Sequence, residues 1–97
     1  MITYNAMKDT QLSRAAASSF KRLSFDIKNP LHVMPLMSKY LVDVNYNNLE
    51  HKWYATKMVS IGAQKQVILG WGDCPLRAIT ICCLKVSDLI DAHDADV

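Results

Sequence analysis

The strongest constraint on the fold is an apolar stripe in the last quarter of the sequence. Its members are spaced 3, 4, 3 and 4 residues apart, and they are Leu76, Ile79, Cys83, Val86 and Ile90. This spacing places them on one face of an α-helix, which the Cys74-Pro75 pair would open. An apolar helix face must pack against another element, and we expect that element to be one face of a β-sheet.

Three segments upstream of this helix have the character of β-strands. They are residues 41–46, 51–59 and 64–69. The middle segment contains the β-favouring run Trp53-Tyr54-Ala55-Thr56, and the first alternates apolar and polar side chains. Asn47-Asn48 and Gly62 supply turns between the segments. Because both connections are short, we predict an antiparallel meander.

Two further helices are expected before the strands. The first begins at the Asp9-Thr10 pair, either member of which can cap it, and ends near residue 20. The second begins at Asn29-Pro30, with asparagine as the cap and proline in the first turn. Pro35 lies inside this second helix, so we expect a kinked or late-starting helix that ends near residues 39–40. Its apolar side is expected to consist of Leu31, Met34, Leu36 and Met37.

These elements predict a layered α+β domain in the order αα-βββ-α, a small antiparallel three-stranded sheet packed with two to three helices. The length of 97 residues fits one domain. We place this domain at residues 1–92 and expect residues 93–97 to form a frayed acidic tail. The net charge of +2 is unevenly distributed, because the last ten residues hold four aspartates, whereas the rest holds 11 basic against 5 acidic residues. Such a basic body could attract phosphates.

The cysteines indicate a reducing compartment. Cys74, Cys82 and Cys83 make an odd number without the spacing of a disulfide framework, and adjacent free cysteines in a helix usually behave as small buried hydrophobes. No signal peptide is visible at the N-terminus, and the longest apolar stretch, residues 78–84, is too short to span a bilayer. We therefore expect a cytoplasmic protein without membrane contact.

Several short motifs, in order, resemble the NinX-like bacteriophage proteins and, more broadly, the small phage domains described as α/β/α sandwiches. The motifs are Phe25-Asp26, Asn29-Pro30, Met34-Pro35-Leu36, Trp53-Tyr54-Ala55-Thr56 and Pro75-Leu76-Arg77-Ala78. The resemblance covers about residues 25–86. It implies a phage or prophage accessory protein in the host bacterial cytoplasm, and it implies no reaction. Cys74 departs from the pattern, since relatives carry Asn, Ser or Thr before the proline.

One glycine-containing segment could bind an anion. Gly70-Trp71-Gly72 precedes the last helix, and Arg77 lies in that helix's first turn, where backbone N–H groups and a guanidinium can hold a phosphate. Asp73 at the same helix end would repel an anion. The alternative is a tight strand-to-helix connector without a ligand.

Residues typical of catalysis or metal binding are not arranged as a site. The histidines His32, His51 and His93 lie far apart and beside no cysteine at ligand spacing, so we expect no metal and no cofactor. Cys74 at a helix N-terminus could form a reactive thiolate, but no histidine is identified as its base, and Asp73 opposes the charge. We therefore expect a protein that is not an enzyme.

Aromatic and basic residues supply the candidate binding surface. Trp53 and Tyr54 are neighbours in one strand and must point to opposite faces, so at most one of them enters the core. The other could join Trp71 as an exposed aromatic group, with Lys52 and Lys57 near it in sequence. Alternatively, the lysines protect an exposed sheet edge.

The sequence favours two functional hypotheses over a third, an enzyme built on Cys74 or on the Asp73–Arg77 turn. The first is a phage accessory protein that binds a host protein, inhibits a host defence and pairs as a homodimer. The second is a binder of nucleic acid, nucleotide or phosphate through the basic body, the Gly70–Asp73 segment and Arg77.

Overall fold

The computed structural model describes residues 3–95 and confirms the predicted α+β class. A short 3-10 turn, η1, precedes three α-helices and one antiparallel sheet of three strands. In chain order the elements are η1 (Tyr4–Ala6), α1 (Asp9–Ser19), α2 (Pro30–Tyr40), β1 (Asp43–Asn47), β2 (Lys52–Ile61), β3 (Gln64–Gly72) and α3 (Pro75–Ala95).

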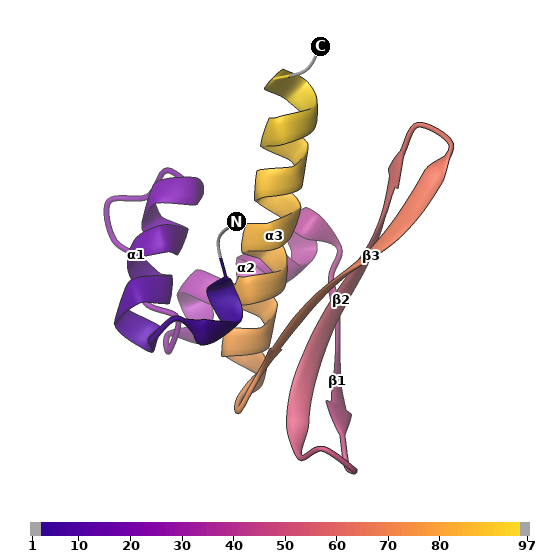
Figure 1. The fold of residues 1–97 in the computed structure, drawn as a ribbon. Helices are drawn as coiled ribbons and strands as arrows, with labels where there is room; N and C mark the ends of the chain where they lie inside the picture. The colour runs from indigo at the N-terminus through magenta and orange to yellow at the C-terminus, as the bar shows by residue number, and fades with distance from the viewer. Residues whose placement is uncertain (1–2, 96–97) are drawn as a thin grey trace.

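The strands form the predicted meander in the order β1-β2-β3, but their lengths differ. The short strand β1 pairs with β2 only between Lys52 and Thr56. The pairing of β2 with β3 continues to Ile61 and Gln64, so the outer part of the sheet is a two-stranded ribbon. Figure 1 shows this ribbon projecting away from the helices. Gly62 makes the turn at its tip with a φ of 60°, a conformation that glycine adopts at little cost.

Helix α3 is the central element of the fold. It lies between the sheet on one side and α1 and α2 on the other (Figure 1). Every residue from Ala78 to Leu84 is buried, so this stretch of α3 has no solvent face. Helix α1 contributes Leu12 and Ala16 to the core, and α2 contributes Val33 and Leu36. The order of layers is therefore helices, α3, sheet, which differs from the α/β/α order that the resemblance implied.

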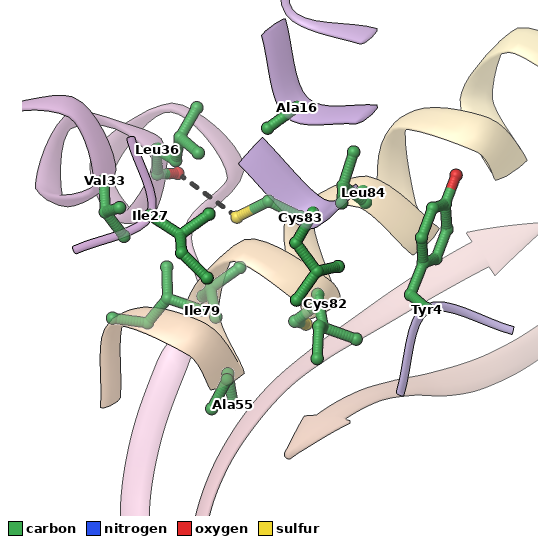
Figure 2. Close-up of a cluster of buried hydrophobic side chains, with 14 of the residues drawn as sticks. Tyr4, Ala16, Ile27, Val33, Leu36, Ala55, Ile79, Cys82, Cys83 and Leu84 are labelled. Carbon is green, nitrogen blue, oxygen red and sulfur yellow. Dashed lines mark hydrogen bonds between the residues drawn. The ribbon is translucent and has the colours of Figure 1, made fainter. Parts of the chain in front are cut away.

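The apolar stripe of α3 does not face the sheet as expected. Cys83, at its centre, points toward α2, and its Sγ lies 3.9 Å from the carbonyl oxygen of Leu36 (Figure 2). The sheet instead packs on the face that carries Ala78 and Cys82, whose Sγ donates to the carbonyl of Ile68 at 3.6 Å. The prediction was wrong because α3 is apolar all around in this stretch, so spacing alone could not assign its faces to partners.

The N-termini of the first two helices agree only in part with expectation. Helix α1 begins at Asp9, but Lys8 is the cap residue, and its N–H donates to the side chain of Gln11 at 2.8 Å. Asn29 caps α2 as predicted, because its Oδ1 accepts from the N–H of Leu31 at 2.9 Å. Helix α2 starts at Pro30 and includes Pro35, so the predicted late start was wrong.

The buried side of α2 also differs from the predicted one. Leu31 and Met34 were expected in the core, but they are 81% and 47% exposed, whereas Val33 and Leu36 are buried. Residues 31 and 34 lie on a different face of a 3.6-residue helix from residues 33 and 36. Both faces are apolar, so the sequence did not distinguish them.

The boundaries around the last strand and helix are the remaining differences. Gly70-Trp71-Gly72 does not end the sheet, because these residues belong to β3 and pair with Trp53 to Ala55. Strand β1 begins at Asp43 rather than at Leu41, whose φ of 53° ends α2. Helix α3 continues to Ala95, beyond the boundary expected at residue 92. Residues 96–97 of the expected tail lie outside the described residues.

Candidate binding surface

The face of the sheet turned away from α3 carries a pair of large aromatic side chains. Tyr54 in β2 is paired with Trp71 in β3, and their ring centroids lie 6.2 Å apart at an angle of 81°. Because strand side chains alternate, the neighbours Ala55 and Gly70 point the other way, toward α3. The edge-to-face arrangement of the rings is favourable and holds both in place.

Apolar side chains continue along the ribbon on the same side. Leu69, opposite Thr56, is 37% exposed, and Met58 and Val67, which face each other, are 59% and 60% exposed. We call this surface the open face, and define it by Lys52, Tyr54, Thr56, Met58, Lys65, Val67, Leu69 and Trp71. Its paired side chains form three rows across the two strands. The aromatic row is Tyr54 with Trp71, the middle row is Thr56 with Leu69, and the aliphatic row is Met58 with Val67. Large apolar side chains exposed together in this way are typical of interaction surfaces.

Polar residues border the open face on the β1 side. The register places Asp43 beside Thr56 and Asn45 beside Tyr54. Next to them lies a shallow hollow of about 650 Å³, lined by residues that include Asn45, Tyr54, Thr56 and Leu69. The hydroxyl of Tyr54 donates to a carboxylate oxygen of Glu50, and this hydrogen bond raises the pKa of Tyr54. The surface therefore has an apolar centre and a polar rim, as protein interfaces do.

Charges of both signs surround the apolar rows. The ammonium of Lys52 lies 5.0 Å from the centroid of the Trp71 ring, within the range of a cation–π interaction. Lys65 lies near the ribbon tip, opposite Ser60. Asp43 and Glu50 supply negative charge on the β1 side. The face is therefore not uniformly basic, although the body of the chain is.

The structure separates the six residues that sequence analysis grouped. Lys52, Tyr54 and Trp71 come together on the open face. Trp53 and Lys57 lie on the opposite face, where the Trp53 ring packs 5.1 Å from that of Tyr46. The exposed rows of Leu69, Met58 and Val67 were missed, although their alternation with neighbours in the strands was the signal that could have revealed them.

Arg77, the sixth residue, connects the start of α3 with the segment that leads into α1. Its guanidinium donates to Asp9 Oδ1 at 2.8 Å and to the backbone carbonyl oxygens of Asn5 and Met7 at 3.2 and 2.6 Å. The aliphatic part of the same side chain lies against Gly72, where an added Cβ would approach it to 2.9 Å. These contacts give Arg77 a structural role, and none of them was visible from the sequence, because the partners lie about 70 positions away.

The segment predicted to hold an anion serves the packing of the sheet on α3. Gly70 is buried, and a Cβ on it would lie 2.5 Å from the backbone nitrogen of Cys82. A hollow of about 520 Å³ does lie beside the start of α3, lined by residues of both signs that include Lys8, Asp9, Lys52 and Asp73. Anion binding there stays a prediction.

The three cysteines lie in two different environments. Cys74 is exposed before α3, whereas Cys82 and Cys83 are buried. Burial raises the pKa of Cys82 to about 11 and that of Cys83 to about 12, because a buried thiolate loses its hydration. Among the side chains that the structure describes, those of residues 3–91, no group of three His, Cys, Asp or Glu is placed to hold a metal ion.

These environments predict which cysteine reacts. Iodoacetamide at neutral pH is expected to add one label per folded chain, at Cys74, because the buried thiols are both inaccessible and protonated. Peptide mass mapping identifies the labelled cysteine, and labelling in denaturant should reach all three. Equal labelling of Cys74, Cys82 and Cys83 in the folded protein would contradict the burial of the latter pair.

Of the helices in residues 3–95, none is both long enough and apolar enough to cross a membrane. A comparison with protein-family models, with curated proteins and with solved structures found no match to this chain.

Proposed function

We propose that this chain is a small phage accessory protein that acts by binding a host protein through its open face, in the cytoplasm of the host bacterium. The observation that carries the proposal is the exposed aromatic and aliphatic surface on the side of the sheet without helices. Tyr, Trp and Met are the residues that protein interfaces favour most. The resemblance to phage proteins supports the proposed setting, and inhibition of a host defence is the proposed consequence of the binding.

The charges of the open face favour a protein over a nucleic acid as the partner. Binding to nucleic acid depends on neutralising phosphates with a basic surface. Here Asp43 and Glu50 lie on the same side of the sheet as Lys52 and Lys65. A protein partner can match such a mixed pattern with its own charges.

Affinity capture tests the proposal with a matched pair of variants. Trp71→Ala removes a ring from the aromatic row of the open face, whereas Leu49→Ala removes a side chain that is 93% exposed in the turn after β1. After nuclease treatment of a host lysate, we expect one host protein to be retained by wild type and by Leu49→Ala. Its retention by Trp71→Ala should fall by roughly tenfold or more, the loss expected when a tryptophan that anchors an interface is truncated. Equal capture by all three proteins would contradict binding through this face.

The second candidate is a nucleic-acid binder, and the contact of Lys52 with Trp71 favours it. A lysine over an indole ring combines charge with a stacking surface, as in proteins that bind single strands. This function predicts that DNA or RNA binds with an affinity that falls steeply with salt. It also predicts that nuclease removes the captured material.

A further inference from the structure

We propose that a second copy of this chain covers the open face when no partner is bound, so that the binding surface is masked by self-pairing. The pairing itself is independent of any partner. If the proposed function holds, a host protein must displace the second copy before it can bind, and this regulation of binding rests on the proposed function.

The first support is the amount of exposed surface. The chain has an accessible surface of 6496 Å². A compact monomer of this mass is expected to expose about 5,600 Å². The excess of about 900 Å² is close to the roughly 800 Å² that each partner buries in a standard protein interface. The outer part of the ribbon projects away from the helices (Figure 1), and its side chains Met58 and Val67 are 59% and 60% exposed.

The second support is the charge pattern, which suits self-pairing. A symmetric dimer places the same patch on both sides of the interface, so the patch must be complementary to itself. A face with one sign of charge would repel its copy. The open face has an apolar centre, and at its base Lys52 and Asp73 line the same hollow, so both signs of charge are present there.

The charges also favour one orientation of the two copies. If their strands ran antiparallel, β1 would lie over β1, and the two Asp43 carboxylates would meet. If the strands run parallel, β2 of one copy lies over β3 of the other. Each row then covers the corresponding row, Lys52 faces Asp73 of the second copy, and Asp43 stays at the outer rim. Since opposite charges attract and like charges repel, the parallel arrangement is favoured.

Sedimentation equilibrium of the purified full-length chain tests the pairing. Wild type is expected to sediment as a dimer at micromolar to tens of micromolar concentrations. Leu69→Lys places a charge in the middle row and should raise the dissociation constant at least roughly thirtyfold. Leu31→Lys makes the same substitution on the outer side of α2 and should leave it unchanged. Circular dichroism confirms that both variants are folded. A monomeric wild type, or equal dimerisation of the two variants, would overturn the proposal.

Cross-linking of introduced thiols tests the orientation. Ser60→Cys lies near the ribbon tip, and in a Cys74→Ser background it is the sole exposed cysteine among the described residues. Parallel copies place both tips at the same end of the dimer, with the sheets about 10 Å apart, so a bismaleimide of about that span should link the two introduced thiols. Ser38→Cys on α2, in the same background, should stay unlinked. A dimer that Ser60→Cys fails to link would overturn the parallel arrangement.

These experiments use no host protein, so they can refute self-pairing without refuting the proposed function. A monomer that still captures a host protein refutes the pairing alone. A dimer that captures nothing refutes the proposed function and leaves self-pairing in place.

Discussion

Gly70→Ala is expected to lower the free energy of unfolding by roughly 3 kcal/mol or more, the largest effect of any single substitution that we propose. The added Cβ would lie 2.5 Å from the backbone nitrogen of Cys82 and would also overlap the carbonyl oxygen of Ala78. Both obstacles are backbone atoms of α3, so no side-chain rotation relieves the clash. The helix and the sheet would have to move apart, and the core between them would open. Urea unfolding followed by circular dichroism measures the change.

The control for this prediction is Gly62→Ala in the turn of the ribbon. It adds the same methyl group, but no atom lies within 4 Å of the new Cβ. Its cost of roughly 1 kcal/mol comes from the positive φ alone. Equal destabilisation by Gly62→Ala and Gly70→Ala would show that α3 does not pack directly on β3 at this position.

Arg77→Met is expected to lower the free energy of unfolding by about 2 kcal/mol. The substitution keeps much of the apolar stem but leaves the carbonyl oxygens of Asn5 and Met7 without their donor. The ion pair with Asp9 adds less, because that carboxylate is 45% exposed and water screens it. The change should also release the segment before α1, which hydrogen exchange at its amide groups can detect.

Two variants separate the geometry of Arg77 from its charge. Arg77→Lys keeps the charge but cannot reach several acceptors at once, so it should recover less than half of the lost stability. Arg14→Met removes an exposed cation from α1 and should change stability by less than about 0.5 kcal/mol. If Arg14→Met costs as much as Arg77→Met, overall charge rather than the fork of hydrogen bonds is responsible.

Local sequence signals predicted the features that depend on neighbouring residues. The Asn29 cap, the strand alternation and the turn at Gly62 each follow from a few adjacent side chains, and all three are present. The meander followed from short connections. The contacts of Arg77 and the hydrogen bond from Tyr4 to Asp88 join positions 68 to 84 residues apart, so no local pattern could reveal them.

The sequence predicts that one face of the sheet is open, but it does not say which of the two faces that is. Alternation required Trp53 and Tyr54 to face opposite sides, but it could not tell which side α3 would cover. That choice depends on Gly70, because the lack of a side chain there lets α3 approach the sheet on the side of Ala55. Trp71 and Leu69 are exposed as a consequence, and Tyr54 is half-buried on the same face. From the sequence, Gly70 indicates a strand-to-helix connector. In the structure it lies inside β3, where it marks the contact of α3 with the sheet.

The central position of α3 determines the order in which this chain can fold. Helices α1 and α2 and the sheet all pack on α3, yet α3 is the last of these elements to leave the ribosome. Until it is synthesised, the apolar sides of the earlier elements have nothing to cover them, and chaperones or aggregation compete for them. Docking of the N-terminal segment also needs α3, since Tyr4 donates to Asp88 and Arg77 donates to the carbonyl of Met7. We therefore expect the β2–β3 hairpin, whose turn is short, to pair early and the common core to form only after α3 is present.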